Sequence, residues 1–413
     1  MPDATPQRAA RLAFWVPFWG SVLVFLIGAG ASLSNLNIRG EVQTWGLAAL
    51  AVVAAGGLFF SVVALRRGQR RALAGLALSL FLVCIVAGNA ILIFRLAQRQ
   101  SPVDLLRPFE ELRAGAEPVA VWIDTDAACG RGRTADVDDC WALAAALRSP
   151  EIAIRGVSTT FGNVDGPAAL EVTREVLQRL GDGHPPPVFR GADVRLEKLE
   201  KSPPAVDAMA AALRTEPLVV IALGPATNVA ALLRSHPSVA PRIRRLVLVA
   251  GRRPGNLFHP GEQWWFHFRD FNVSKDKAAT SEVLYSGVPI TLVPFELATG
   301  LVITGADLDG LRREPGPGRW LAQVSAPWYR LWRDRLHRKG FSPFDVLAVG
   351  YVSSPQLFDC RITRARIGFS AFLAPFGLGR DLEVGDSFAG PPVEYCVDVQ
   401  SRFKEKLLNR LTG

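Results

Sequence analysis

The second half of the chain alternates between short apolar runs and longer helical patterns. The runs are rich in β-branched residues, as strands are. They comprise Val119–Ile123, Ile152–Thr160, Leu218–Leu223, Leu246–Ala250 and Ile290–Val293. The helical patterns between them comprise Asp139–Arg148, Ala168–Leu180, Thr227–Arg234 and Lys275–Tyr285. Continuously apolar strands separated by helices are typical of a parallel sheet that helices cover on both faces. The sequence therefore predicts one mostly parallel α/β domain, which we place at residues 117–413.

The first 94 residues have a different character. Three runs there lack any charged side chain: residues 12–33, 45–65 and 72–94. Each is long enough to cross a bilayer of about 30 Å as a helix. A cleaved signal peptide explains the first run poorly, because two more runs follow it. We expect a membrane region of three transmembrane helices at 1–94, joined to the α/β domain by a linker at 95–116.

The distribution of charge predicts how this region is oriented. The chain has a net charge of +9, of which +5 belongs to residues 1–94 and +4 to the rest. So small an excess on the large domain does not favour nucleic acid as a partner. The loop 66–71 carries four arginines, and such loops are usually cytoplasmic. Although Arg95 and Arg99 argue the other way, we expect a multi-pass membrane protein with its large α/β domain outside the cytoplasm.

Four carboxylates gather where the first predicted strand of this domain ends and its first helix begins. They are Asp124, Asp126, Asp138 and Asp139. In an open α/β sheet, ligands bind at the carboxyl ends of the strands. Hard oxygen ligands in this number suit Ca²⁺ or Mg²⁺. The alternative is that Asp138 and Asp139 only stabilise the start of the helix, where carboxylates are favoured.

Further polar residues follow later strands. Asn163 comes after the second strand, Asn256 and Asn272 come after the Leu246–Ala250 strand, and Asp345 opens an apolar helical pattern. Each of these residues alone suits an ordinary turn or helix cap. Their repeated occurrence at strand and helix ends favours one shared ligand site.

Four cysteines lie in the large domain. Cys360 and Cys396 are in strand-like segments that could pair, while Cys129 and Cys140 bracket the acidic segment. Two disulfides suit an oxidising compartment, and four free thiols are the alternative. No cysteine or histidine spacing predicts a zinc site.

Six blocks of sequence carry a resemblance to a known family. In order, they read DTD…DVDDCWALAAAL, VSTTFGNV, IALGPATNVAALL, LVLVAG…GN, FNV and FDVLAVGYV. From about Val119 to the C-terminus the chain resembles the nucleoside hydrolases, the inosine/uridine-preferring nucleoside ribohydrolases. The resemblance implies a Ca²⁺ enzyme that cleaves the N-glycosidic bond of ribonucleosides to give ribose and free base.

The resemblance also implies roles for individual residues. The metal ligands would be Asp126, Asp139, Asp345 and the backbone carbonyl of Leu223. Asp126 would also be the catalytic base. The substrate-binding residues would be Asp138, Asn163, Asn256, Asp270 and Asn272, with Asp124 as a supporting carboxylate.

The chemistry of such a site can be argued from its residue types. Breaking a bond between C1′ and nitrogen builds positive charge on the ribose, which carboxylates stabilise. Bound calcium would acidify a water molecule, and a neighbouring aspartate can accept its proton. We therefore expect direct attack by a metal-bound water with inversion at C1′, and no covalent intermediate.

The chain departs from the family pattern at three positions. Eleven residues, 127–137, separate Asp126 from Asp138, where the family usually has three. Asp270 stands where many members have glutamate. Phe344 stands where purine-cleaving members have the histidine that protonates the departing base, so the general acid is unassigned.

Two other classes of function compete with the enzyme. A membrane-tethered protein that binds nucleosides or ribose without catalysis is one, and Phe344 favours it. A phosphate-transferring hydrolase of the haloacid dehalogenase type is the other, since Asp124-Thr125-Asp126 resembles its first motif. That motif, however, expects threonine or valine where Ala128 stands. The base preference is left open, as is the formation of homo-oligomers.

Overall fold

The computed structural model describes residues 117–131, 136–181, 183–256, 269–298, 300–368 and 381–412. The runs predicted to span the membrane (12–33, 45–65 and 72–94) and the predicted linker at 95–116 lie outside these residues. Within the described ranges, no helix combines the length and the apolar character needed to cross a bilayer. The transmembrane helices therefore stay predictions from the sequence.

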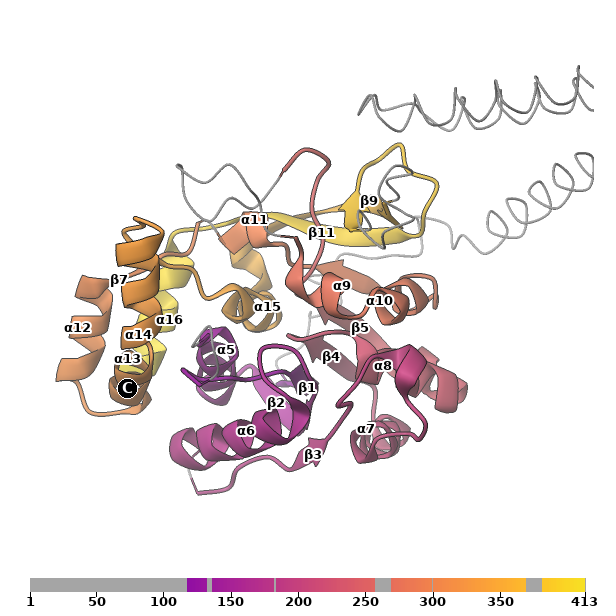
Figure 1. Ribbon diagram of the computed structural model, residues 1–413, viewed down its shortest axis with the longest axis horizontal. Helices are drawn as coiled ribbons and strands as arrows, with labels where there is room; N and C mark the ends of the chain where they lie inside the picture. The colour runs from indigo at the N-terminus through magenta and orange to yellow at the C-terminus, as the bar shows by residue number, and fades with distance from the viewer. Residues whose placement is uncertain are drawn as a thin grey trace, which may run out of the picture. The chain divides into compact units, whose positions relative to one another are not determined.

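The described residues form an α/β fold around a nine-stranded sheet (Figure 1). The strand order is β10-β9-β11-β6-β5-β4-β1-β2-β3. The strands are β1 (Val119–Thr125), β2 (Ile152–Thr159), β3 (Val188–Arg190), β4 (Leu218–Ala222), β5 (Ile243–Leu248), β6 (Ile290–Leu292), β9 (Phe358–Ile367), β10 (Leu382–Val384) and β11 (Pro392–Val399). All neighbouring pairs are parallel except β9 with β10 and β9 with β11. The predicted mostly parallel sheet is confirmed.

Helices pack on both faces of this sheet, as the apolar strands predicted. The helices are α5 (Asp138–Leu147), α6 (Gly166–Leu180), α7 (Pro204–Thr215), α8 (Thr227–Ser235), α9 (Phe271–Lys275), α10 (Lys277–Leu284), α11 (Phe295–Ala298), α12 (Gly305–Arg313), α13 (Pro317–Val324), α14 (Ala326–Arg330), α15 (Phe344–Ser353) and α16 (Arg402–Thr412). Helices α5, α6, α15 and α16 share one core with alternate residues of β1 and β4. Helices α7, α8 and α10 share a second core with the other residues of β1 and β4, which point to the opposite face of the sheet. Figure 1 shows α5 and α15 apart from α7 and α8, with the strands between.

The order of the strands locates the place where a ligand can bind. Strand β1 lies between β2, which follows it in sequence, and β4. The chain thus runs outward from β1 in one direction to β3, and in the other direction from β4 to β6. Doubly wound sheets open a crevice at such a switch point, beyond the carboxyl ends of the strands. Asp126 directly follows β1 and Leu223 directly follows β4, so both predicted site residues stand at this switch point.

Some elements differ from their predicted form. The predicted helix Lys275–Tyr285 is confirmed as α10, which begins two residues later, and a separate short helix, α9, precedes it and ends at Lys275. The Asp276 carboxylate accepts a hydrogen bond from Ala279 N–H and so caps α10. The stretch 316–339 contains α13, α14 and a π-helical turn, η4 (Leu331–Arg335). Strand β3 and helix α7 were not predicted. Strand β3 has only three residues, whereas the apolar stripe of α7 at Val206, Met209 and Leu213 was a signal that the sequence analysis missed.

Short elements complete the described fold. They are the 3₁₀ turns η2 (Leu196–Lys198), η3 (Pro237–Arg242) and η5 (Pro355–Leu357), and a two-stranded sheet of β7 (Ile303–Thr304) with β8 (Gly340–Phe341).

Both disulfides that the sequence left open are present. Cys360 in β9 is bonded to Cys396 in β11, and the two residues are partners in the antiparallel register of these strands. Cys129 is bonded to Cys140 at the start of α5.

A buried polar cluster fixes α15 against the sheet. The Tyr351 hydroxyl donates a hydrogen bond to the Glu394 carboxylate in β11, and Thr291 in β6 donates to the same oxygen over 3.0 Å. Since α15 begins with Phe344 and Asp345, this cluster holds the helix that carries a predicted metal ligand.

A close contact between β1 and β2 generates a stability prediction. A methyl group at Gly156 would lie 2.4 Å from the Trp122 ring. That ring is buried, stacks on Phe189 and donates a hydrogen bond to Ser158, so it has no room to move. We expect Gly156→Ala to lower the free energy of unfolding by about 1–3 kcal/mol, as overpacking does.

Denaturant titration of the purified chain measures this effect, with Gly310→Ala as the matched control. No atom lies within 4 Å of a methyl group at Gly310, which is inside α12. Replacing a glycine within a helix by alanine stabilises by about 0.5–1 kcal/mol. An equal change in the free energy of unfolding for the two substitutions would show that the Trp122 ring can move to make room for the methyl group.

Candidate active site

Asp126 is the centre of the predicted site, and it is buried at the end of β1. Two glycines from the neighbouring loops lie against its carboxylate. A methyl group at Gly162 would be 1.8 Å from Asp126 Oδ2, and one at Gly224 would be 2.8 Å from Oδ1. Only residues without a side chain allow the loops after β2 and β4 to approach the carboxylate this closely. The GN and GP motifs of the sequence therefore shape the surroundings of Asp126.

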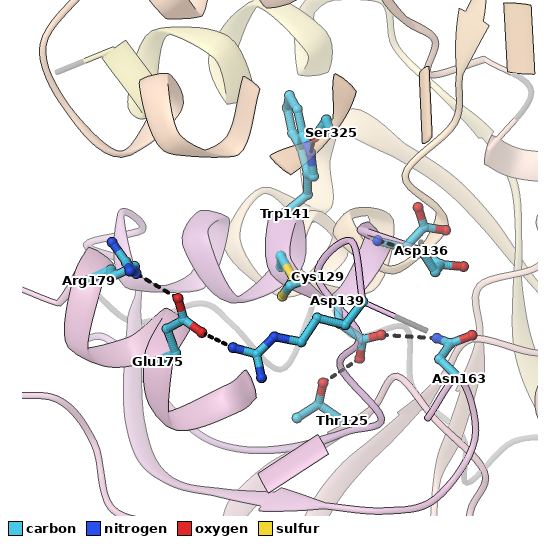
Figure 2. Close-up of a disulfide and its surroundings, with 12 residues drawn as sticks. Thr125, Cys129, Asp136, Asp139, Trp141, Asn163, Glu175, Arg179 and Ser325 are labelled. Carbon is cyan, nitrogen blue, oxygen red and sulfur yellow. Dashed lines mark hydrogen bonds and ion pairs between the residues drawn. A yellow bond between two sulfur atoms is a disulfide. The ribbon is translucent and has the colours of Figure 1, made fainter. Parts of the chain in front are cut away.

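Asn163 and Thr125 connect Asp126 to Asp139. Asn163 N–H donates to Asp126 Oδ2 over 2.7 Å, and its side-chain amide donates to Asp139 Oδ2 over 3.4 Å. The Thr125 hydroxyl and Asp126 N–H both donate to Asp139 Oδ1. Figure 2 shows Thr125 and Asn163 on either side of the Asp139 carboxylate. The structure thus brings Asp126, Asp139 and Asn163 together, as predicted.

Asp138 and Asp345 belong to two helices that begin at the same place. Asp138 Oδ2 accepts a hydrogen bond from Phe344 N–H over 3.2 Å, which links the first turns of α5 and α15. Asp138 Oδ1 is buried without a hydrogen-bond partner among the described residues. Asp345 is also buried. A buried carboxylate oxygen without a partner is costly, so its position next to other carboxylates indicates a missing cationic or hydrogen-bonding ligand.

The electrostatics of the cluster reflect burial and repulsion. Burial raises the pKa of Asp126, Asp138 and Asp345 well above the ordinary value for an aspartate, and neighbouring carboxylates raise each pKa further. Burial also raises the pKa of Asp139 to about 6, against the lowering effect of the Thr125 hydrogen bond. These carboxylates destabilise one another's charged form, and a bound cation would relieve that repulsion.

Asp136 joins this cluster although the sequence analysis assigned it no role. Its Oδ1 accepts a hydrogen bond from Asp138 N–H over 2.9 Å. Burial raises its pKa to about 6, and its charge raises the pKa of Asp126, Asp138 and Asp345. The short spacing to Asp138 in the run Asp136-Val137-Asp138-Asp139 was the available signal. It was overlooked because Asp136 lies in the segment that departs from the family pattern.

Asp124 lies beneath the cluster, inside the sheet. Its Oδ1 accepts hydrogen bonds from the Ser158 hydroxyl over 2.5 Å and from the Asn228 amide over 2.7 Å. Burial raises its pKa to about 7, while these two hydrogen bonds oppose the shift. The Asn228 amide also donates to Thr159 O. Asp124 thus joins the ends of β1, β2 and the start of α8, a place that suits a supporting carboxylate. Asn228 belongs to the quoted ATN motif and was given no role there.

Leu223 and Asn272 form a pair. The Asn272 amide donates to Leu223 O over 2.6 Å and to Val249 O over 3.1 Å. The backbone carbonyl predicted to bind the metal is therefore oriented by the asparagine predicted to bind the sugar. This amide also connects the loops after β4 and β5.

Asp270 and Asn256 have other partners in the structure. Asp270 caps α9 by accepting a hydrogen bond from Val273 N–H over 3.0 Å, and its second oxygen accepts one from Gly251 N–H over 2.8 Å. Burial raises the pKa of Asp270 to about 6. The Asn256 amide donates to Glu296 over 2.7 Å. Residues 257–268, which separate Asn256 from Asp270, lie outside the described residues. Among the described residues, neither Asn256 nor Asp270 has a hydrogen bond to the carboxylate cluster.

Glu296 is a further residue that the sequence analysis missed. Besides Asn256, its carboxylate accepts hydrogen bonds from the backbone and the side chain of Arg253. Glu296 lies in α11, a four-residue helix without any periodic signal in the sequence.

A divalent cation suits this cluster by charge and by ligand type. Aspartate and backbone carbonyl oxygens are the hard ligands that Ca²⁺ prefers. The buried carboxylates of Asp126, Asp139 and Asp345 are ligands of this kind. Among the described residues, however, no three acidic, histidine or cysteine side chains are arranged so that they could already hold a metal ion. The fit therefore rests on the chemistry of the donors and on their mutual repulsion.

Comparisons with known proteins identify the family of the chain. Residues 121–400 match the model of the inosine-uridine preferring nucleoside hydrolase family. The non-specific ribonucleoside hydrolase RihC of Salmonella agona is 28% identical over 246 residues, which cover 54% of this chain and 77% of RihC. RihC of Klebsiella pneumoniae strain 342 is 26% identical over the same length and coverage.

Solved structures share the fold. A plant nucleoside hydrolase, PpNRh1, has a TM-score of 0.60 and 22% identity, and the match covers 72% of this chain and 99% of PpNRh1. The purine-preferring ribonucleoside hydrolase of Gardnerella vaginalis has a TM-score of 0.58 and 20% identity, with 71% and 98% covered.

The family match spans more than half of the chain and contains the carboxylate cluster. The chain belongs to the inosine-uridine preferring nucleoside hydrolase family, and it is a ribonucleoside N-glycosidase.

Proposed function

We propose that the protein is a calcium-dependent enzyme that hydrolyses ribonucleosides to ribose and free base by a single displacement with water. The observation that carries this proposal is the buried cluster of Asp126, Asp138, Asp139 and Asp345 at the switch point of the sheet. Repulsion between these carboxylates favours the binding of a divalent cation. Their negative charge would also stabilise a transition state in which the ribose is positively charged.

The cation would be held by Asp126, Asp139, Asp345 and the backbone carbonyl of Leu223. When bound, Ca²⁺ would compensate the repulsion between carboxylates and lower the pKa of a nearby water molecule. The hydrogen bond from Asn272 to the Leu223 carbonyl supports this assignment, since ligands of metals are commonly oriented by such partners.

The protein residues would act around this cation as follows. Asp126 accepts the proton of the attacking water, because its carboxylate lies at the end of β1 among the groups that would hold the cation. Asp138 and Asn163 bind ribose hydroxyls, and the buried Asp138 oxygen without a partner supports that role. Asn256, Asp270 and Asn272 bind the remainder of the sugar, and Asp124 supports the strand ends from below. Binding the sugar through many groups aligns C1′ with the water.

The departing base has no assigned acid. Phe344 cannot donate a proton from its side chain, and its ring lies 6.3 Å from that of Trp332, centroid to centroid. We therefore leave the substrate as the class of ribonucleosides. The name of the relatives, non-specific ribonucleoside hydrolase, supports a broad range of bases.

We also propose that the domain is anchored in a membrane and faces an oxidising compartment. The three uncharged runs at 12–33, 45–65 and 72–94 and the four arginines of 66–71 support the anchor and its orientation. The disulfides Cys129–Cys140 and Cys360–Cys396 support the compartment, because disulfides are rare in the cytosol.

The hydrolase predicts calcium-dependent release of base. We expect the purified chain to release free base from a panel of purine and pyrimidine ribonucleosides with Ca²⁺ and not with chelator. Asp126→Asn keeps the shape of the side chain but removes the base, so kcat should fall by about a hundred- to ten-thousand-fold. Chromatography of the products measures the release.

The control for this experiment is Asp309→Asn. Asp309 is an exposed aspartate of α12, with 62% of its side chain accessible, so its substitution should leave kcat unchanged. A wild-type chain that binds ribonucleosides in a calcium-dependent manner and releases no base would instead establish the membrane-tethered binding protein, which Phe344 favours.

The membrane proposal has its own test. Protease added to intact spheroplasts should digest the large domain, because we expect it outside the cytoplasm. A chain without residues 1–94 should leave the membrane fraction. Digestion only after lysis of the spheroplasts would show that the domain faces the cytoplasm instead. Recovery of the full-length chain in the soluble fraction without detergent would contradict the membrane anchor.

A further inference from the structure

The segment between Asp126 and Asp138 is unusually long and is closed by a covalent bond. It contains the eleven residues 127–137. Cys129 follows Asp126 by three positions, and Cys140 directly follows Asp139. The disulfide between these cysteines joins the two arms of the segment, with their Cα atoms 5.6 Å apart. It therefore connects the strand end that carries Asp126 with the helix start that carries Asp139.

The two arms are packed at the base of the segment. Ala128, Val137 and Cys140 are buried, and Gly130 N–H donates to Asp136 O over 2.9 Å. Cys129 has a φ of 49°, in the left-handed region that residues other than glycine seldom adopt. Such a conformation persists where the surrounding structure imposes it. In Figure 2 the disulfide at Cys129 lies beside Asp139.

At Arg131, the last described residue before 132–135, the contacts of the segment are at the surface. Arg131 is exposed and pairs with Glu171 and Glu175 of α6 over 2.9 Å and 2.5 Å. Exposed ion pairs of this kind contribute little to stability. The disulfide is therefore the strongest described connection between the two arms.

The two arms have a physical reason to separate. They carry Asp126 on one side and Asp136, Asp138 and Asp139 on the other, and these carboxylates repel one another. A free chain of eleven residues also pays more conformational entropy to bring its ends together than a chain of three does. A cation that binds to separated arms would lose affinity, because part of its binding free energy would be used to close them.

We propose that the Cys129–Cys140 disulfide is a positioning device for the cation site, which compensates for the long segment 127–137 by holding Asp126 and Asp139 in register. The cysteines themselves would bind neither cation nor substrate. This inference rests on the calcium site of the proposed function.

The test compares two variants that each lack one disulfide. Cys129→Ala/Cys140→Ala opens the base of the segment, and Cys360→Ala/Cys396→Ala removes the bond between β9 and β11 as the matched control. Calcium binding by the full-length chain in detergent micelles is measured by calorimetry. We expect Kd for Ca²⁺ to rise about ten- to a hundredfold in the first variant, as for other groups that orient metal ligands. In the control Kd should change less than about twofold, because that disulfide orients no ligand.

A third variant tests the role of segment length. Deleting residues 128–135 leaves three residues between Asp126 and Asp138, and Cys140→Ala in the same chain removes the remaining thiol. If the disulfide compensates for length, this short chain should bind Ca²⁺ within about threefold of the wild type although it has no disulfide there. Should the Cys129→Ala/Cys140→Ala variant fail to fold, this short chain alone decides: tight binding supports the proposal, and weak binding overturns it.

Catalysis gives a further readout that a general loss of stability would not produce. In the Cys129→Ala/Cys140→Ala variant, base release should need more Ca²⁺ for half-maximal rate, and kcat should return to the wild-type value at saturating Ca²⁺. An unchanged Kd for Ca²⁺, or an equal loss in both disulfide variants, would overturn the proposal. A wild-type chain that binds no Ca²⁺ would overturn the cation site together with this inference. Calcium binding without base release would overturn only the hydrolase.

Discussion

Repulsion between buried carboxylates is the constraint on which the rest of this structure depends. Burial disfavours the charged forms of Asp126, Asp138, Asp139 and Asp345. Repulsion from neighbouring carboxylates adds to this effect at Asp126, Asp138 and Asp345, so the fold must hold these groups together against an electrostatic cost. Their position at the switch point of the sheet gives the reason why the cost is tolerated. A cation, or a sugar that develops positive charge, would be attracted to these carboxylates. The charges that repel one another therefore also favour a positively charged ligand.

Hydrogen bonds from the surrounding helices and strands hold these carboxylates in place. The first turns of α5 and α15 meet through the hydrogen bond from Phe344 N–H to Asp138. Helix α15 is in turn held to the sheet by the hydrogen bond from Tyr351 to Glu394. Below the site, Asp124 connects two strand ends and α8 through Ser158 and Asn228. Tyr351, Glu394, Ser158 and Asn228 have no proposed contact with a substrate, yet each one limits how far the carboxylates can move.

Two departures from the family pattern lie close to the carboxylates, one at Phe344 and one in segment 127–137. At Phe344, where the sequence resemblance predicts the histidine of purine-cleaving members, the structure has a ring that packs beside Trp332. In segment 127–137 the chain gains Asp136, whose charge acts on the cluster, and a disulfide at the base of the segment. The two changes lie at neighbouring places, because Phe344 N–H contacts Asp138, which directly follows the segment.

The sequence by itself determined the class of the fold, and it predicted residues that the structure brings together. Alternating strands and helices predicted the parallel sheet because a strand buried on both faces must be apolar throughout, a property that local sequence displays. Asp126, Asp139 and Asn163 were found because each follows or begins an element with a clear pattern. Only the tertiary structure decided the partners of these groups. That Asp270 caps α9, that Glu296 binds Asn256, and that Asn272 orients Leu223 O depend on contacts between residues far apart in the chain, which no local pattern encodes. The pairing of the cysteines was left open for the same reason: a disulfide needs two Cα atoms at the right separation, and folding alone sets that separation.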